Sequence, residues 1–354
     1  MPGVSVVIPS YNMAAYVGAA IDSALAQDHP LVEVIVVDDA SSDGSREIIS
    51  GYADRVRVLL LENNVGQSEA LNAAWPLARY PIIVFLDADD LLLPHAAARL
   101  ASVFAEKTAK VQFCLQTIDA TGRPLDHVAP KYPADLDTET IRGELLRTGS
   151  SPAAQGSGNA YAKWMLERMV DDDAFSIPGG ERLWMDAILE INAPFYGEVL
   201  TLQEPLASYR MHDANWSGHA EISAAKFARM VEFFELKLAY LAKRCAARGV
   251  RFDRDAARSS ALWAVEYRVA AAKLDPGSAG DRSRHLLRQA LRACANSVYP
   301  LQQKLLRGAW IAGVCLLPKP LASRLIGWRF IVRQRPQWIE SFVRRERPSR
   351  RRLA

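Results

Sequence analysis

Short runs of consecutive apolar residues, rich in β-branched side chains, recur along the first half of the chain. The first two occupy residues 4–8 and 32–37. Runs of this kind are typical of strands that are covered on both faces. Between them, residues 14–26 place apolar side chains at helical spacing. This order predicts a β-α-β unit, in which the two strands lie parallel.

The same alternation continues for about another eighty residues. Ser41 or Ser42 is expected to cap a helix that follows the second strand, since a hydroxyl can accept from free backbone N–H groups. Three more strands are expected at 57–61, 82–86 and 111–117, and helices at 68–77 and 96–106. The pattern predicts an α/β fold with a mostly parallel sheet flanked by helices, whose ligands bind beyond the carboxyl ends of the strands.

The last third of the chain has a different character. From residue 221 onward the sequence is helical in spacing and rich in Ala, Leu and Arg. We therefore predict two parts, an α/β domain over residues 1–220 and an α-helical region over 221–354. A chain of 354 residues with 50% hydrophobic side chains is long enough to build both.

Charge is concentrated at the C-terminus. The formal net charge is +3, yet residues 321–354 hold ten Arg against Glu340 and Glu346. The remainder is slightly acidic, which gives no reason to expect a nucleic-acid partner. Trp and Phe side chains alternate with the Arg residues between 305 and 342. The segment is predicted to bind an anionic membrane surface, although an ordinary helical subdomain with a solvated Arg-rich end explains it equally well.

Cysteines and apolar segments bear on the cellular compartment. The four cysteines contain no CxxC pair, so neither a zinc site nor a disulfide framework is indicated. We find no secretory signal and no run of about 18 to 20 apolar residues. The sequence therefore predicts a cytoplasmic protein, held through its tail at the inner face of the cytoplasmic membrane.

Carboxylates follow two of the expected strands. Asp38 and Asp39 end the second one, and Asp87, Asp89 and Asp90 follow the strand at 82–86. Parallel strands bring both groups to one edge of the sheet, where crowded carboxylates favour a hard divalent cation. A turn or helix cap explains the first group equally well. The second group, Asp87, Asp89 and Asp90, indicates a functional site for such a cation.

Four motifs together resemble the inverting, nucleotide-sugar-dependent glycosyltransferases of family 2, which have the GT-A fold. They are VSVVIPSYN at 4–12, VVDDASSDGS at 36–45, NVGQSEALNAA at 64–74 and VFLDADD at 84–90. GSGNAY at 156–161, LWMDAIL at 183–189 and the segment 197–217 are similar to acceptor-side segments of that family. The resemblance spans residues 4–218 and does not reach the C-terminal helices.

The resemblance implies a donor site for a nucleoside-diphosphate sugar, a UDP-sugar first of all. Asp39 would hydrogen-bond the base, whereas Asp38 could instead cap the following turn. Gly66 would permit a backbone conformation with positive φ. Asp87 would face the ribose and the sugar. The other implied contacts to the nucleotide are Pro9, Ser10, Tyr11, Asn64 and Ser68.

The resemblance also implies a metal ion. Asp89 would bind Mn²⁺ or Mg²⁺, which bridges the diphosphate and neutralises charge on the leaving group. His212 could complete the metal shell, and Arg210 would steady the diphosphate. A single His after a strand is more often structural, so a structural role for His212 stays open.

A general base is expected on the acceptor side. Inversion needs a group that takes the acceptor hydroxyl's proton on the face opposite the leaving group, and Asp186 is the candidate. Met185 occupies the preceding place, where this family frequently has Glu. Glu181, five residues before Asp186, is the second choice. Asp186 could instead be a solvated carboxylate on an amphipathic helix. Trp164 and Trp184 could stack on an acceptor sugar or belong to the core.

The sequence thus predicts a transferase that moves a sugar from a nucleoside diphosphate to a saccharide or lipid-linked acceptor, in the synthesis of cell-surface polysaccharides or glycoconjugates. A metal-dependent nucleotidyltransferase is one alternative. It would usually carry a Gly-rich loop with a basic residue after the first strand, and this chain has Pro9 to Asn12 there. A non-catalytic GT-A binding module is the other alternative. No GxGxxG follows the first strand, which argues against an NAD-dependent dehydrogenase.

Overall fold

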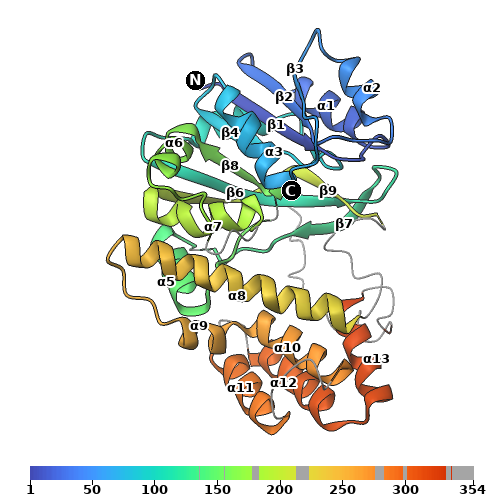
Figure 1. The fold of residues 1–354 in the computed structure, drawn as a ribbon, viewed down its shortest axis with the longest axis vertical. Helices are drawn as coiled ribbons and strands as arrows, with labels where there is room; N and C mark the ends of the chain where they lie inside the picture. The colour runs from blue at the N-terminus through green and yellow to red at the C-terminus, as the bar shows by residue number, and fades with distance from the viewer. Residues whose placement is uncertain are drawn as a thin grey trace, which may run out of the picture. The chain divides into compact units, whose positions relative to one another are not determined.

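The computed structural model describes residues 1–134, 136–154, 156–177, 183–212, 223–275, 283–297, 301–331 and 336. The chain forms two compact units (Figure 1). The first consists of Met1–His212 and Ala239–Phe252, and the second of Asp213–Leu238 and Asp253–Ala354. The first unit has the sheet flanked by helices that the sequence predicts, and the helical character expected for the C-terminal region is confirmed for the second unit.

A nine-stranded sheet forms the centre of the first unit, in the order β3-β2-β1-β4-β8-β6-β9-β5, with β7 beside β6. The first four strands are parallel, as expected, whereas β8 is antiparallel to both β4 and β6. The strands are β1 (Val4–Ser10), β2 (Val32–Asp38), β3 (Arg57–Leu60), β4 (Ile82–Phe85), β5 (Leu91–Leu92), β6 (Thr108–Ile118), β7 (Pro124–Ala129), β8 (Asn159–Ala162) and β9 (Glu198–Arg210).

Apolar side chains on both faces of the sheet are buried, which explains why the strand sequences do not alternate with polar residues. Val6, Ile8 and Val36 belong to one buried cluster with Ile21 of α1 and Leu100 of α4. The helices of this unit are α1 (Val17–Leu25), α2 (Ser45–Ser50), α3 (Gln67–Ala74), α4 (Ala96–Val103), α5 (Thr138–Thr148), α6 (Lys163–Asp171) and α7 (Met185–Tyr196).

The start of α2 differs from the expectation. Gly44 occupies the N-cap position with φ +92°, and no side chain caps the helix. The prediction that Ser41 or Ser42 caps it is therefore wrong. The hydroxyl of Ser41 instead accepts a hydrogen bond from the backbone N–H of Asn12 at 2.9 Å, so it joins two loops.

The helix expected at 68–77 is shorter as a regular α-helix. It ends at Ala74 and continues as a 3₁₀ turn over Trp75–Leu77, in which Pro76 takes an early position. Proline lacks the backbone N–H that the α-helical ladder requires, which accounts for the change.

The second unit is a helical bundle with its own core. Phe227, Val265, Ile311 and Ile326 are fully buried within it. Helix α8 contributes to both units, Ala224–Leu238 to the second and Ala239–Ala247 to the first. The helices are α8 (Ala224–Ala247), α9 (Arg254–Ser260), α10 (Leu262–Leu274), α11 (Ser283–Ala295), α12 (Leu301–Leu316) and α13 (Lys319–Phe330).

A buried ion cluster crosses this bundle. Glu266 on α10 exposes 1% of its side chain, and its two carboxylate oxygens accept from Arg307 on α12 at 3.0 Å and Arg329 on α13 at 2.8 Å. Two guanidinium groups that would otherwise add to the positive surface are therefore held by one interior carboxylate.

Two aromatic residues that the sequence analysis assigned to a membrane surface, Trp310 and Phe330, pack against the core of the bundle. Trp310 donates its indole N–H to the backbone oxygen of Leu325 at 2.8 Å, and the Phe330 ring lies 4.9 Å from the rings of Phe227 and Tyr267. Trp338, Phe342 and the Arg residues from 333 onward lie outside the described residues. In the described part of the chain, no helix is long and apolar enough to cross a membrane.

The four cysteines are all free thiols. Cys114, Cys245 and Cys294 are buried, and Cys315 is half-buried. Burial raises the pKa of all four thiols, that of Cys245 to about 11.

Candidate active site

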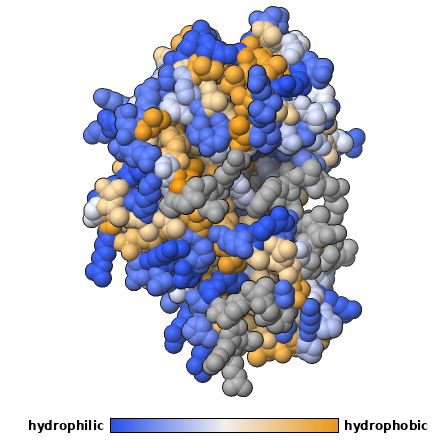
Figure 2. All heavy atoms as spheres, in the orientation of Figure 1, coloured by the Kyte–Doolittle hydropathy of each residue, from blue (hydrophilic) through white to orange (hydrophobic). Residues whose placement is uncertain are grey.

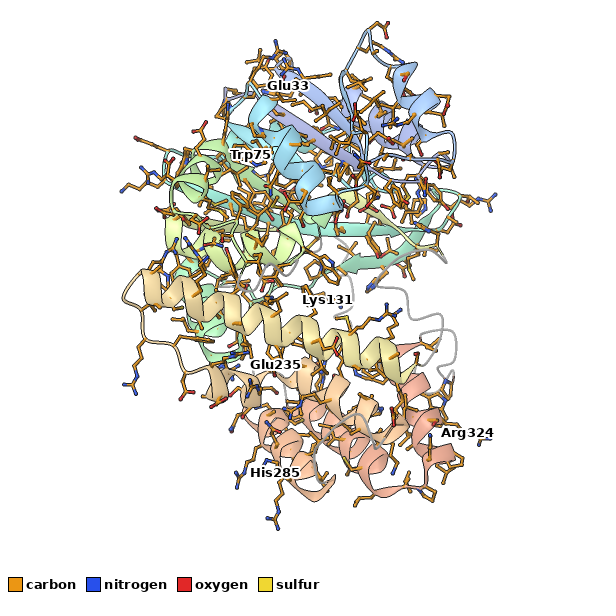
Figure 3. The ribbon with its side chains drawn as sticks, viewed as in Figure 1. Glu33, Trp75, Lys131, Glu235, His285 and Arg324 are labelled. Carbon is orange, nitrogen blue, oxygen red and sulfur yellow. The ribbon has the colours of Figure 1, made fainter. Side chains whose placement is uncertain are left out.

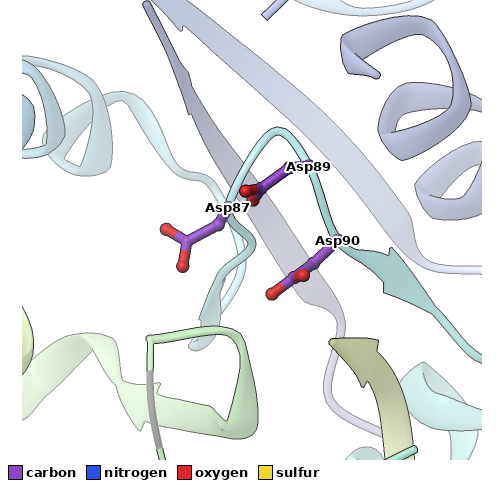
Figure 4. A group of neighbouring side chains, drawn as sticks. All are labelled: Asp87, Asp89 and Asp90. Carbon is purple, nitrogen blue, oxygen red and sulfur yellow. The ribbon is translucent and has the colours of Figure 1, made fainter. Parts of the chain in front are cut away.

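Three carboxylates gather on the loop that joins β4 to β5. Figure 4 shows the side chains of Asp87, Asp89 and Asp90 close together on this loop. Each offers an oxygen that lies within 4.8 Å of the other two. The loop begins where the fully buried strand β4 ends, so the acidic residues stand at the carboxyl edge of the parallel strands, where the sequence places them.

The electrostatics of this loop favour a cation. Burial, together with the charges of the neighbouring Asp89 and Asp186, raises the pKa of Asp87 to about 7. Burial, together with Asp87 and Asp89, raises the pKa of Asp90 well above its usual range. The Oδ2 atom of Asp90 is buried without a hydrogen-bond partner among the described residues. Carboxylate oxygens that are crowded and underused in this way fit a hard divalent cation.

Arg210, the last residue of β9, fixes the acidic loop in place. Its backbone N–H donates to Asp90 Oδ1 at 2.8 Å, and its Nε donates to the backbone oxygen of Asp89 at 2.7 Å. The guanidinium also donates to the oxygen of Ala120 and lies over the Tyr16 ring. Arg210 is 4% exposed. Its expected contact with a diphosphate stays a prediction, whereas its role in positioning the loop is visible.

His212 lies beside the expected metal ligand. Its Nε2 is 2.9 Å from Asp89 Oδ2, and its ring stacks on Tyr16 with centroids 4.8 Å apart. The two residues proposed to share a metal therefore meet, although they are separated by 123 positions in the sequence. An imidazole nitrogen and a carboxylate oxygen are both ligands that divalent transition-metal ions accept.

Two residues that the sequence analysis did not single out orient Asp87. Gln67 donates its side-chain N–H to Asp87 Oδ1 at 2.7 Å, and the hydroxyl of Ser157 accepts from the Asp87 backbone N–H at 3.0 Å. Gly156 leaves room for this carboxylate, because a Cβ there would lie 2.8 Å from Asp87 Oδ2. Gln67 and Ser157 both lie inside motifs used for the resemblance, which was the available signal.

The ends of β1 and β2 form the other side of the site. Pro9 and Ser10 close β1, and Tyr11 follows with 48% of its side chain exposed. The hydroxyl oxygen of Ser10 is buried without a partner among the described residues. Asp38 accepts from the Ser41 backbone N–H at 3.0 Å, so it caps the turn, which is the alternative that the sequence left open.

Asp39 holds the loop before α3. Its Oδ1 accepts from the Val65 backbone N–H at 2.7 Å and its Oδ2 from that of Gly66 at 2.8 Å. Gly66 has φ +90°, which confirms the expected positive value. Asn64 donates its side-chain N–H to the Asp39 backbone oxygen, and Ser68 donates its hydroxyl to the Leu183 oxygen. These residues form one connected edge, and their contacts with a nucleotide stay predictions.

Asp186 is the second residue of α7 and belongs to the same site, because its charge contributes to the raised pKa of Asp87. Its Oδ1 accepts from the Ala187 backbone N–H at 2.7 Å. Glu181, the second choice for the base, lies outside the described residues. Trp184 directly precedes α7, and Trp164 lies on α6 under the guanidinium of Arg168. Their contact with an acceptor is untested.

A family model for glycosyl transferase family 2 matches residues 5–161. A glycosyltransferase of Nostoc sp. described as uncharacterized is 35% identical over 60% of this chain and 66% of its own length. The succinoglycan biosynthesis protein ExoO of Rhizobium meliloti is 41% identical over 60% of this chain and 61% of its own length. The chain thus spans less than two thirds of each of these curated relatives.

Solved structures share the fold. S. aureus TarS 1-349 in complex with UDP-GlcNAc superposes with a TM-score of 0.54 over 98% of this chain and 93% of its own, at 16% identity. The mannosyltransferase PcManGT from Pyrobaculum calidifontis, in complex with GDP-Man and Mn²⁺, has a TM-score of 0.51 over 98% of this chain and 88% of its own, at 20% identity.

Proposed function

Because the chain belongs to glycosyltransferase family 2 through residues 5–161, we propose that it transfers a sugar from a nucleoside diphosphate to an acceptor hydroxyl. One observation carries the proposal: Asp87, Asp89 and Asp90 gather at the end of β4, with His212 beside Asp89. The family assignment argues against the nucleotidyltransferase alternative. It leaves the non-catalytic binding module to be tested by experiment.

The donor is proposed to be a UDP-sugar, and the acceptor a saccharide or a lipid-linked saccharide. Both structural neighbours bind nucleotide sugars, one carrying UDP and the other GDP, which supports the class of donor. The similarity to a succinoglycan biosynthesis protein supports a role in cell-surface polysaccharide synthesis. A location at the cytoplasmic face of the membrane stays a prediction.

The acidic loop and His212 would hold the cation, Mn²⁺ or Mg²⁺, through Asp89 with help from the carboxylates beside it. A divalent cation bound there would supply positive charge for the departing diphosphate. Arg210 keeps the loop in shape through its bonds to Asp89 and Asp90. Gln67 holds the Asp87 carboxylate, which would face the ribose and the sugar.

Asp186 is proposed as the general base. The acceptor oxygen forms a bond to the anomeric carbon while the bond from that carbon to the diphosphate oxygen breaks on the opposite face, and the configuration inverts. The proton of the acceptor hydroxyl passes to the Asp186 carboxylate. A base at the start of α7, near Asp87, is compatible with this geometry.

The proposal is tested by Asp89→Asn, with Asp54→Asn as the matched control on a side chain that is 78% exposed. We expect Asp89→Asn to lose both sugar transfer and Mn²⁺-dependent donor binding, measured by product formation and by titration calorimetry. The unfolding temperature should stay within a few degrees of wild type. Asp54→Asn should behave as wild type.

Two results would contradict these assignments. Near-normal activity of Asp89→Asn would remove Asp89 from the metal site. Wild-type protein that binds nucleotide sugars yet neither transfers nor hydrolyses them would favour the non-catalytic module.

A further inference from the structure

One side of α12 exposes a row of leucines. Leu301, Leu305 and Leu316 expose 71%, 65% and 72% of their side chains. Ala309 and Ala312 fall on the same side, because positions four, eight, eleven and fifteen residues apart share a helix face. Polar side chains are absent from this row. A helix face of this kind is unusual for a surface in contact with water only.

The apolar row continues beyond α12. Leu316 is followed by the exposed Leu317 and then by Leu321 at 45% exposure. On the neighbouring helix α11, Leu291 is 39% exposed and lies next to Gly308 of α12, where a Cβ would be 3.8 Å from its methyl group. The apolar surface therefore covers α12 and the edges of both helices that flank it in sequence.

The helices that form this surface carry charge of one sign. Residues 283–330 contain eight Lys and Arg and no Asp or Glu. Arg307 and Arg329 point inward to Glu266, as described for the bundle. Other cations of these helices point outward: Arg288, Arg292, Lys319 and Arg324 are exposed. Figure 3 shows Arg324 extending away from α13.

In Figure 2, the visible face of the helical unit carries apolar side chains among hydrophilic ones. An apolar row bordered by cations has the composition of a helix that lies in the plane of a lipid interface, with its leucines among the acyl chains and its cations at anionic headgroups.

We propose that the exposed face of α12, defined by Leu301, Leu305, Ala309, Ala312 and Leu316, docks onto an anionic bilayer. A second copy of this chain is a poorer occupant, because two such faces would bring cations against cations. The membrane contact thus lies on the leucines of α12 and not on the aromatic residues to which the sequence analysis assigned it. The Trp and Phe residues were expected to provide that contact, but Trp310 and Phe330 pack against the core of the bundle. It does not depend on glycosyl transfer.

The test is co-sedimentation of the full chain with vesicles of phosphatidylcholine alone or with 30–40% phosphatidylglycerol, roughly the anionic content that makes surface attraction measurable. The variant is Leu305→Gln with Leu316→Gln. The matched control is Leu31→Gln with Leu77→Gln, two leucines of the first unit that are 42% and 37% exposed. Circular dichroism and hydrolysis of a soluble nucleotide sugar check that each variant is folded.

We expect the wild type to bind anionic vesicles and to keep a salt-resistant part of this binding, because apolar insertion is not screened by ions. The α12 variant should bind at least about tenfold more weakly, since each leucine contributes apolar area to insertion. The control pair should bind as wild type. A variant in which Arg350, Arg351 and Arg352 are replaced by Gln should retain the salt-resistant part.

Equal vesicle binding by the wild type and the α12 variant would overturn the proposal. So would loss of all binding in the variant without the three C-terminal arginines, since the tail alone would then be the anchor. A dimer of the wild type that the α12 variant abolishes, without any vesicle binding, would assign this face to a second copy. None of these outcomes would alter the hydrolysis assay that tests the proposed function.

Discussion

Single residues of the acidic loop differ in how much of their bonding capacity the protein uses. Asp90 is buried, and only its Oδ1 atom accepts a hydrogen bond from the described residues, namely from the Arg210 backbone N–H. In Asp89, the Oδ2 atom lies within hydrogen-bond distance of His212 Nε2. Asp87 Oδ1 accepts a hydrogen bond from the Gln67 side chain, and the carboxylate lies near Asp186. The loop thus presents several carboxylate oxygens that a cation and a substrate can still use.

At the residue scale, the base assignment leads to a kinetic prediction. Asp186→Asn keeps the size and most hydrogen bonds of the side chain but cannot accept a proton. Loss of a general base typically costs ~10² to 10⁴ in rate, so kcat should fall while the dissociation constant of the donor stays near that of wild type. A matching series with Glu181→Gln decides between the two candidates. If Glu181→Gln shows the large loss and Asp186→Asn does not, the base is Glu181.

A second residue, Glu33 on β2, should make stability depend on pH. Burial alone would raise its pKa, but hydrogen bonds from Ser5 and Arg79 outweigh burial and lower the pKa below its ordinary value. Glu33 is labelled in Figure 3. A lowered carboxyl pKa stabilises the folded state above the unfolded pKa of about 4.3, and this contribution disappears as pH falls through the folded pKa.

Glu33→Gln should therefore lower the free energy of unfolding by about 1–3 kcal/mol at pH 7, the usual worth of hydrogen bonds to a charged group. The difference from wild type should shrink below pH 4. Urea unfolding at pH 7, 5 and 3.5 measures it, with the exposed Glu106→Gln as control. A difference that grows toward low pH would refute the sign of this effect.

The sequence indicated most of the individual site residues but not how they are held. Asp87, Asp89, Asp186, Arg210 and His212 were all predicted, and the structure gathers them at one edge of the sheet. Gln67, Ser157 and Tyr16 were not singled out, because hydrogen bonds across 20 or 70 positions and ring stacking on a distant histidine leave no local pattern.

At the scale of elements, the short 3₁₀ turn Gly156–Gly158 before β8 sets the space around Asp87. In Gly156→Ala, the new methyl group would lie 2.8 Å from Asp87 Oδ2 and push the carboxylate away from its place. Displacement of a positioned group by about 1 Å can cost on the order of 10²-fold in rate. We expect a loss of that size in kcat/KM for the donor.

The matched control is Gly143→Ala inside α5, where a Cβ meets nothing within 4 Å. Alanine in a helix interior should raise stability by roughly 0.5–1 kcal/mol and leave activity unchanged. Thermal unfolding and initial rates of both variants are the measurements. If the two variants behave alike in the rate assay, Gly156 has no part in shaping the site.

Element boundaries show where local sequence signals are sufficient. Strands β1, β2 and β4 were predicted within two residues, since continuous β-branched runs leave few alternatives. The start of α2 was not, because Gly44 takes a left-handed conformation while Ser41 bonds to another loop. The antiparallel insertion of β8 between β4 and β6 depends on long-range pairing, which no local pattern encodes.

At the scale of the whole molecule, two units with separate cores should respond separately to damage. Glu266→Gln leaves Arg307 and Arg329 without their interior carboxylate, and breaking a buried ion pair from one side costs about 3–5 kcal/mol. The loss should appear in the second unit. Hydrogen exchange of α10, α12 and α13 should speed up, while exchange in β1 and β4 should not change.

Asp255→Asn provides the control in the same unit, because this side chain is 87% exposed and its ion pair with Arg258 should be worth at most about 1 kcal/mol. Equal acceleration of exchange in β1 and α12 after Glu266→Gln would mean that the two units unfold together.

The whole-molecule organisation was only partly visible in the sequence. Helical spacing after residue 221 predicted the helical region, and the structure has it. The return of residues 239–252 to the first unit could not be foreseen, because α8 is one uninterrupted periodic segment whose two halves differ only in their partners. Tyr240, for example, hydrogen-bonds Asn192 of α7, whereas the Phe227 ring meets the Tyr267 ring of α10 edge-to-face.

The shielded thiols make the protein suitable for site-selective fluorescent labelling. Cys114, Cys245, Cys294 and Cys315 are buried or half-buried, and their raised pKa values keep the reactive thiolate scarce at pH 7. A maleimide dye should therefore react first with a thiol introduced at an exposed position such as Leu305→Cys. A polarity-sensitive dye at that position would report, in real time and without removing any native cysteine, whether its surroundings change from water to lipid.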